Sequence, residues 1–371
     1  MVDPDALEEL FARARRDVER GSLPSCQLAL AHDGELVAFE TFGDGATNDH
    51  RYVIFSATKG VVAAAVWLLI GDGVLDPGAP VADTIDEFGS NDKQSITTEQ
   101  LLTHTAGLPR APLGPPAWFD RERRLEQFAK WRLNWEPGTR CEYHASSAHW
   151  VLAELIERLS GSDYRDFVHE RIADALGLQA LRLGVPAAEQ ADIRRVQAVG
   201  SPPSAEEWAS IGLAGIEIPD EVNDTTILRL ADTDTIALGV PGGGAVSTAA
   251  DVARLYQSLL HNPGRLWDPD VLADATGHVR VTLDEPTVGG PALRTLGLIV
   301  AGDDGLGVRR GFGATNSPRA FGHSGAGGQL AWADPDTGIS FCYLTDGNDA
   351  NLLQEGRRRA GLSNQAGRVV H

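Results

Sequence analysis

The chain enters its most apolar segment at Ser56-Ala57-Thr58-Lys59, which is followed by Gly60-Val61-Val62-Ala63-Ala64-Ala65-Val66-Trp67-Leu68-Leu69-Ile70. Because the second run is apolar on every side, it predicts a helix that is buried in the core. Residues three positions apart share one face of a helix, so the Ser56 hydroxyl and the Lys59 amine are expected to lie together. An amine whose pKa is lowered by burial can accept the proton of a serine hydroxyl. The stretch therefore predicts a serine nucleophile with a lysine base at the start of a core helix.

A purely structural interpretation is that Ser56 caps this helix and Lys59 is a surface lysine of its first turn. A lysine is disfavoured near the positive N-terminal end of a helix, however, and the chain uses lysine only at positions 59, 93 and 130. Both facts favour a chemical role for Lys59. The same spacing recurs in Ser90-Asn91-Asp92-Lys93, but no apolar segment follows it, so we expect a turn there.

The composition limits the kinds of partner to consider. The 371 residues are enough for two domains or for one domain with a large insertion, and 42% hydrophobic and 23% charged residues are ordinary for a globular protein. A formal net charge of −20 argues against nucleic acid or anionic membranes as partners. We also expect no membrane insertion, because the longest apolar run is too short to span a bilayer.

Location and metal binding can be judged from a few residues. Positions 1–10 carry neither a basic nor an apolar signal region, so a cytoplasmic location is the default expectation. Cys26, Cys141 and Cys342 are too few and too widely spaced for a disulfide framework or a metal cluster, and we expect small buried hydrophobic residues. The closest histidine pair, His144 and His149, lacks the spacing that shares one helix face. The sequence therefore predicts neither a metal nor a cofactor.

The order of the predicted elements indicates an α+β fold. A capped helix is expected after Asp3-Pro4, and alternating apolar residues on both sides of Asp33-Gly34 predict a β-hairpin. The further helices expected are 97–104, 121–131, 145–159, 163–176 after a cap at Ser162, one from the cap Thr248 to about residue 261, and 352–360. The further strands expected are 295–301, 329–333 and 339–344.

This order predicts that the two ends of the chain build one sheet domain. Residues 1–55 and 245–371 would form it, and residues 56–244 would form a mostly helical domain inserted between them. An active site at the junction would then draw residues from all three stretches. The stretches 109–120 and 201–238 are irregular in pattern and are expected to shape a substrate pocket.

Two other segments carry residues that suit such a site. Glu136-Pro137-Gly138 is a turn that leads towards a helix and places Tyr143 at a loop-to-helix junction. Phe321-Gly322-His323-Ser324-Gly325-Ala326-Gly327-Gly328 enters a predicted strand with enough glycine for another molecule to approach its backbone.

Together with Leu101-Leu102-Thr103-His104-Thr105-Ala106-Gly107-Leu108-Pro109 and Gly239-Val240-Pro241-Gly242-Gly243-Gly244-Ala245-Val246-Ser247-Thr248, these segments resemble the serine β-lactamase and penicillin-binding-protein superfamily. The resemblance runs in order from about Ser22 to Asp346 and is nearest to the class C β-lactamase-like branch with its family VIII carboxylesterases. It implies an antiparallel β-sheet flanked by helices, with an inserted, mostly helical domain.

The resemblance also implies roles for individual residues. Ser56 would be the acylated nucleophile, Lys59 its proton acceptor and Tyr143 the phenol that relays the proton. His323-Ser324-Gly325 would replace the Lys-Thr-Gly element, with His323 and Gly325 contacting substrate, and the backbone N–H groups of Ser56 and Ala326 would form the oxyanion hole. Trp118, in a proline-rich loop, could line an acyl pocket. His104 is typical of the superfamily as a structural residue and is left out of the site.

Two departures from the family pattern bear on the substrate. The asparagine of the Tyr-x-Asn element is Ala145 here, and the lysine of the third element is His323, which is expected to be largely neutral near pH 7 in an ordinary environment. Both changes remove polar recognition of a penicillin-like substrate and leave the acylating groups in place. They favour a carboxylesterase that acts on small carboxylic esters.

Other functions stay open at this point. Hydrolysis of amide substrates, as a β-lactamase or a D-amino-acid amidase or peptidase, is the alternative reaction, and a non-catalytic binding protein of the same fold is the alternative class. An α/β-hydrolase with Ser324 in its nucleophile elbow is disfavoured, because a strand pattern follows that serine where such an elbow needs a helix. The expected partner is a small-molecule ester or amide, and the sequence predicts no oligomeric state.

Overall fold

The computed structural model describes residues 2–210 and 224–370, and its largest sheet is built from both ends of the chain. Within this part of the chain the sheet has six strands in the order β2-β1-β12-β11-β10-β9, and every pair is antiparallel. The strands are β1 Ser25–His32, β2 Glu35–Gly43, β9 Ile299–Val300, β10 Phe321–Gly322, β11 Leu330–Asp334 and β12 Ile339–Thr345. The predicted α+β class and antiparallel sheet are confirmed.

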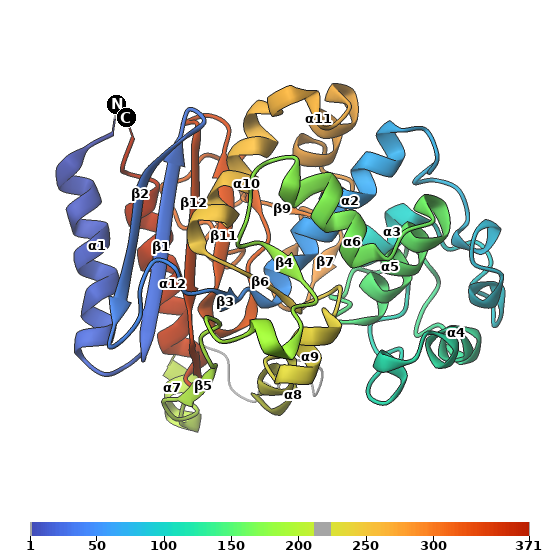
Figure 1. Ribbon diagram of the computed structural model, residues 1–371, viewed down its shortest axis with the longest axis horizontal. Coiled ribbons are helices and arrows are strands. Elements are labelled where there is room, and N and C mark those ends of the chain that lie inside the picture. The colour runs from blue at the N-terminus through green and yellow to red at the C-terminus, as the bar shows by residue number, and fades with distance from the viewer. Residues whose placement is uncertain (1, 211–223, 371) are drawn as a thin grey trace.

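Helices cover both faces of this sheet (Figure 1). Large side chains such as Leu30, Trp332 and Phe341 point to the face covered by α1 (Pro4–Glu19) and α12 (Leu352–Ala366). Small ones such as Ala29 and Cys342 point to the face covered by α10 (Ala249–His261). The alternation follows from the two-residue period of a strand, and small residues allow α10 to approach closely.

The turn and cap signals of the sequence are placed as expected. Asp33 and Gly34 have φ values of +50° and +87°, the left-handed pair that a tight hairpin turn requires. The Asp3 side chain accepts a hydrogen bond from the Asp5 N–H at 2.9 Å and so caps α1. Thr248 likewise accepts from the Asp251 N–H, at 3.3 Å, and caps α10.

The middle of the chain is mostly helical, as predicted. Its helices are α2 Thr58–Gly71, α3 Thr98–Leu102, α4 Arg121–Lys130, α5 Ser147–Ser160, α6 Tyr164–Val168, α7 Ala205–Ser210, α8 Asp224–Leu230 and α9 Thr233–Leu238, and α11 Pro269–Gly277 follows α10. The short strands are β3 Tyr52–Val53, β4 Arg182–Leu183, β5 Gln197–Val199, β6 Ala245–Ser247, β7 Asp284–Glu285, β8 Gly290–Pro291 and β13 Gly347–Asp349.

Two of the expected elements differ from the structure in detail. The helix expected over 163–176 is capped by Asp163 in place of Ser162, and after α6 it widens into a π-helical turn. The strand expected over 295–301 is reduced to β9, because Gly297 has φ +105° and breaks the extended run. A Cβ at Gly297 would lie 2.5 Å from the Cβ of Ala63, so this break lets the segment pack directly against α2.

The stretches expected to be irregular are partly helical. Residues 109–120 form a loop that ends in a 3₁₀ turn, Ala117–Phe119. The stretch 201–238 contains α7, α8 and α9, and its residues 211–223 lie outside the described part of the chain. Short helices of this kind carry too few periodic apolar positions to be recognised in sequence.

The buried helix α2 lies at the centre of the molecule (Figure 1). Its side chains from Val61 to Leu69 are at most 2% exposed and share one core with α5, α10 and the near face of the sheet. The division into domains at residues 55 and 245 stays a prediction. Cys26, Cys141 and Cys342 are buried and free, as expected.

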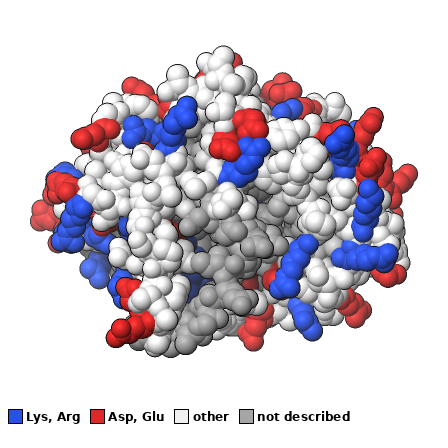
Figure 2. All heavy atoms as spheres, turned by 90° about the horizontal axis from the view of Figure 1, so that it is seen from below, with Lys and Arg blue, Asp and Glu red and all other residues white. Residues whose placement is uncertain are grey.

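Figure 2 shows acidic and basic side chains intermingled around the rim of one face, so the net negative charge is not gathered into a single patch there. No helix among residues 2–210 and 224–370 combines the length and the apolar character that a bilayer crossing needs.

Candidate active site

Ser56 lies in a 3₁₀ turn, Phe55–Ala57, that joins β3 to the buried helix α2. Phe55 immediately before it has φ +45°, which is unusual for a residue with a side chain and costs on the order of 1–3 kcal/mol. The conformation is held because the Phe55 ring is 1% exposed and packs with Val185, Ile236 and Val246. Burial of the Phe55 ring thus fixes the backbone conformation before Ser56 and, with it, the direction in which the Ser56 side chain projects.

The Lys59 amine lies one helical turn further on and is 1% exposed. Its Nζ is 3.4 Å from the Ser56 Oγ, and it donates to the carbonyl oxygens of Ala145 at 2.9 Å and Gly242 at 2.6 Å. Burial, together with the positive charge of Arg294, lowers the pKa of Lys59 to about 7. The amine is therefore partly unprotonated near neutral pH.

The carbonyl groups of Ala145 and Gly242 determine which part of the neutral Lys59 amine faces Ser56. A neutral amine has two N–H donors and one lone pair. When Ala145 and Gly242 take both donors, the remaining lone pair is available to the Ser56 hydroxyl. A Cβ at Gly242 would lie 3.3 Å from Nζ, so glycine also leaves the amine room.

Tyr143 lies beside both groups. Its side chain hydrogen-bonds Ser56, and the Lys59 Nζ is 4.9 Å from the centre of the phenol ring. Burial raises the pKa of Tyr143 to about 12, while the bond to Ser56 and the charge of Arg294 act in the opposite direction. Tyr143 is thus a neutral phenol at rest, in contact with the hydroxyl that the sequence predicts as nucleophile.

His323 is 3% exposed and faces the same group of residues. Burial first, then the charges of Lys59 and Arg294, lower its pKa to about 3. Its Nδ1 lies 2.9 Å from the carbonyl oxygen of Ser324, which can only accept, so Nδ1 carries the proton. The buried Nε2 then has a lone pair and no protein partner. His323 therefore presents a neutral acceptor where a lysine would present a cation.

The glycine-rich segment that follows brings Ala326 next to Ser56. A Cβ at Gly325 would lie 2.4 Å from the Ile54 carbonyl oxygen, so only glycine lets this loop pack on the residues before Ser56. Ala326 and Ser56 then line the same small cavity. Gly325 allows this close packing because it has no side chain. Its contact with substrate stays a prediction.

The cavity at Ser56 is small and mainly apolar, with a volume of about 50 Å³. Its wall includes Ser56, Trp118, Ile227, Leu230, Val240 and Ala326. Trp118 is held there by a hydrogen bond from its Nε1 to the Leu113 carbonyl at 2.9 Å. The structure thus brings Trp118 to the predicted pocket, together with three residues of α8, Thr226, Ile227 and Leu230, that the sequence pattern did not single out.

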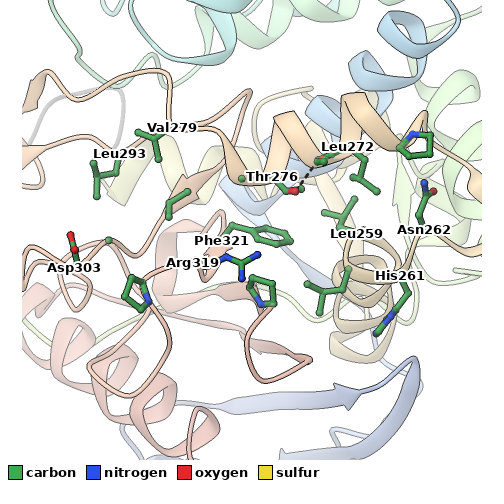
Figure 3. Close-up of a pocket in the computed structure, with 18 of the residues that line it drawn as sticks. Leu259, His261, Asn262, Leu272, Thr276, Val279, Leu293, Asp303, Arg319 and Phe321 are labelled. Atoms are coloured by element: carbon green, nitrogen blue, oxygen red, sulfur yellow. Dashed lines mark hydrogen bonds between the residues drawn. The ribbon is translucent and has the colours of Figure 1, made fainter.

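A larger hollow of about 710 Å³ lies apart from Ser56, between α10, α11 and β9 (Figure 3). Leu259, Leu272 and Phe321 form much of its wall. Thr276 donates to the Leu272 carbonyl at 2.8 Å, and Asn262 donates to Trp267 at 2.8 Å, so these polar groups are already paired. The hollow contains none of the predicted site residues.

The neighbouring histidines His104 and His144 make hydrogen bonds to the backbone that hold the surrounding loops in place. His104 accepts a hydrogen bond at Nδ1 from the His144 N–H at 3.0 Å, and His144 in turn accepts at Nε2 from the Leu108 N–H at 2.9 Å. Burial lowers the pKa of both rings. They fix the loop that carries Tyr143, which agrees with leaving His104 out of the site.

Two features near the site were not found by sequence reasoning. The first is the pair of carbonyls on Lys59, which no residue type reveals because backbone atoms supply them. The second is Arg294, 3% exposed and paired with Glu285 behind Tyr143. A lone arginine directly before the expected strand 295–301 was the signal that the sequence offered for it.

The second Ser-x-x-Lys match forms a turn, as predicted. Asn91 and Asp92 have positive φ values, and the Lys93 Nζ donates to the carbonyl oxygens of Ser90 and Trp131. Ser324 is followed by a 3₁₀ turn and strand β11, so it has no nucleophile elbow.

Comparison with known proteins agrees with this geometry. The chain is 26% identical over 332 residues to the Mycobacterium tuberculosis protein named Esterase/beta-lactamase LipL, covering 80% of this chain and 69% of that one. It is 28% identical over 282 residues to Esterase EstB of Burkholderia gladioli, covering 65% and 69%. A family VIII carboxylesterase structure has the same fold, with a TM-score of 0.78, 22% identity and coverage of 99% and 98%. Residues 10–365 match the family described as Beta-lactamase, and the chain therefore belongs to that family.

Proposed function

We propose that this protein is a serine hydrolase that forms an acyl-enzyme at Ser56 and acts as a carboxylesterase on small esters. The observation that carries the proposal is the position of the Lys59 amine, whose two N–H donors are engaged by carbonyls while its lone pair is left for the Ser56 hydroxyl at 3.4 Å. A serine becomes a nucleophile when a base takes its proton, and this amine is held for that transfer.

Acylation follows from the same geometry. As the Ser56 Oγ attacks the ester carbonyl carbon, its proton passes to the Lys59 Nζ. The backbone N–H groups of Ser56 and Ala326 receive the oxyanion. When the C–O bond breaks, the alcohol oxygen takes a proton from the Tyr143 phenol, which regains one from the Lys59 ammonium. Water then attacks the acyl carbon by the reverse proton route and releases the acid.

The surroundings of Ser56 favour an ester over a β-lactam. A penicillin-like substrate carries a carboxylate, and a cation at the third motif would attract it. His323 is neutral and offers an acceptor there, and Ala145 offers no side-chain amide. The apolar cavity of about 50 Å³ suits a short acyl group. Relatives named as esterases support the same reaction.

Intact-protein mass spectrometry with a fluorophosphonate, together with turnover of p-nitrophenyl butyrate and of the chromogenic cephalosporin nitrocefin, tests the proposal. We expect a single adduct, ester turnover and little nitrocefin turnover. Slow ester turnover, together with covalent capture of penicillins at Ser56 and turnover of nitrocefin, would make β-lactam or amide hydrolysis the main reaction. A well-folded protein with neither an adduct nor turnover would be a binding protein of this fold.

A further inference from the structure

A buried ion pair lies behind Tyr143. Arg294 and Glu285 are 3% and 1% exposed, and one guanidinium nitrogen donates to both carboxylate oxygens at 2.7 and 2.9 Å. Glu285 belongs to β7, and Arg294 lies between β8 and β9, with backbone bridges to Val281 and Ile299. Removing two charges from water is costly, so a pair in this position calls for an explanation beyond stability.

The guanidinium is close to the groups that move the proton. Its Cζ is 5.7 Å from the centre of the Tyr143 ring, and the Lys59 Nζ is 4.9 Å from the same centre. Arg294 also hydrogen-bonds the Cys141 thiol, two residues before Tyr143. Its Nε is buried and has no protein partner. Two basic side chains therefore lie beside one phenol ring, and one of them, Arg294, is a cation held in place by a carboxylate.

Several titratable groups face Lys59, and the charge of Arg294 acts on most of them. These groups are Tyr143, His104 and His149 from the helical part and His323 from the glycine-rich segment. Arg294 lowers the pKa of Lys59, Tyr143, His104 and His323. Glu285 acts in the opposite direction on the pKa of Tyr143, and of these two charges Arg294 has the larger effect. The pair thus acts on this site as a net positive charge.

We propose that Arg294, clamped by Glu285, is a positioning residue for acyl transfer: its fixed charge beside Tyr143 disfavours a second positive charge on the nearby Lys59 amine and stabilises the phenol oxygen as it gives up its proton. This rests on the proposed function. A positive charge that stabilises developing negative charge is usually supplied from within a substrate cleft. Here the cleft residue at the third motif, His323, is neutral, and the cation stands behind the phenol.

The test compares wild type with the double variant Glu285→Gln/Arg294→Gln, which removes both charges and leaves no unpaired ion. Arg294→Lys is the conservative variant that keeps the charge. Asp349→Asn/Arg358→Gln is the matched control, because Asp349 and Arg358 form another pair in which both residues are 3% exposed, between β13 and α12. Melting temperatures of all four proteins separate a loss of folding from a loss of chemistry.

Two readouts are measured. The first is kcat and KM for p-nitrophenyl butyrate as a function of pH. The second is the titration of Lys59 by NMR with ¹³C-labelled lysine, which is practical because the chain contains lysine only at positions 59, 93 and 130. In the double variant we expect kcat at pH 7 to fall on the order of 10- to 100-fold with little change in KM. The Lys59 titration and the acidic limb of kcat/KM should both move to higher pH.

Arg294→Lys should restore part of both effects, and the control pair should leave both unchanged. A double variant that folds but keeps the wild-type Lys59 titration and pH profile would overturn the inference while leaving the esterase proposal intact. If wild type shows no turnover, the proposed function fails, and the NMR titration still decides whether Arg294 sets the protonation of Lys59.

Discussion

The Lys59 amine donates to the Gly242 carbonyl oxygen across 2.6 Å. No carboxylate among the described residues binds this amine, since its hydrogen bonds run to Ser56 Oγ and to two backbone carbonyls. A carboxylate would raise the pKa of the amine and hold its proton, whereas carbonyls orient it without adding charge. This distinction underlies the predictions that follow.

Ser56→Ala should abolish both the fluorophosphonate adduct and ester turnover, because it removes the hydroxyl that the Lys59 amine contacts. Ser90→Ala is the matched control, since Ser90 stands three residues before another buried lysine, Lys93. We expect that control to keep full activity and labelling. Activity that persists in Ser56→Ala would place the nucleophile elsewhere, with Ser324 the first residue to examine.

Activity should depend on pH in the direction set by Lys59. The amine acts as a base only when it is unprotonated, and its pKa is lowered to about 7. We therefore expect kcat/KM to fall as the pH drops through about 7 and to level off above it. A flat profile between pH 5 and about 9 would show that Lys59 does not take the proton. Lys59→Ala should lower turnover by about 10² to 10⁴ above the pKa of Lys59, and by less at acidic pH, where the wild-type amine is protonated as well.

Tyr143→Phe should lower kcat by about 10² to 10⁴, since the phenol can no longer pass a proton to the leaving alcohol. The ring that packs near Lys59 and His104 is retained, so the melting temperature should change little. Esters of more acidic alcohols need less help in leaving. If the loss is as large for p-nitrophenyl as for ethyl esters, proton transfer to the alcohol is not the role of Tyr143.

Leu230→Ala should shift the preferred acyl chain from butyrate towards hexanoate and octanoate, because Leu230 forms part of the cavity of about 50 Å³ at Ser56. One methylene in an apolar pocket is worth about 10- to 200-fold in specificity. Leu228→Ala is the control, a truncation of the same residue type on α8 that does not line this cavity. Equal chain-length profiles for both variants would show that the acyl group binds elsewhere.

The packing of the Gly297 segment on α2 predicts opposite effects for two glycine substitutions. Gly297→Ala should reduce the free energy of unfolding by about 2–4 kcal/mol, since it combines a positive φ with a Cβ placed against Ala63. Gly356→Ala, in α12 with open space around it, should increase that free energy by about 0.5–1 kcal/mol. Urea unfolding midpoints measure both, and destabilisation by the second would contradict the argument.

Much of the fold was predictable because its signals are local. The Asp33-Gly34 hairpin, the Asp3 cap and the apolar run of α2 each contain their own evidence. The strand expected over 295–301 was too long because Gly297 packs against Ala63, which is distant in the sequence. No local pattern of residues reveals such a contact. Expectations were therefore met where the determining interaction lies within a few residues.

The site was predictable to a different extent. Ser56 and Lys59 follow from helical spacing, and the structure brings them to 3.4 Å. Tyr143, His323 and Ala326 came from family resemblance, and their roles stay predictions. Arg294 is visible in the sequence only as a lone charge, and its place beside Tyr143 could not be predicted because Glu285 and Tyr143 lie in separate segments. The cavity residues Ile227 and Leu230 lie in the stretch 201–238, which was expected to shape the pocket but has no period that would single them out.

The sheet order has a consequence for biosynthesis. The Ser25 N–H donates to the Asp346 carboxylate at 2.8 Å, a buried contact between residues 321 positions apart. At translation rates of ~5–20 residues per second, the nascent β1-β2 hairpin waits roughly 15–60 s for β12 to emerge from the ribosome. Throughout that time the edge of β1 that will pair with β12 presents unpaired N–H and C=O groups to other chains. Ser56 and Lys59 are made early, but the newborn polypeptide gains its hydrolytic site only when nearly all of it has been synthesised.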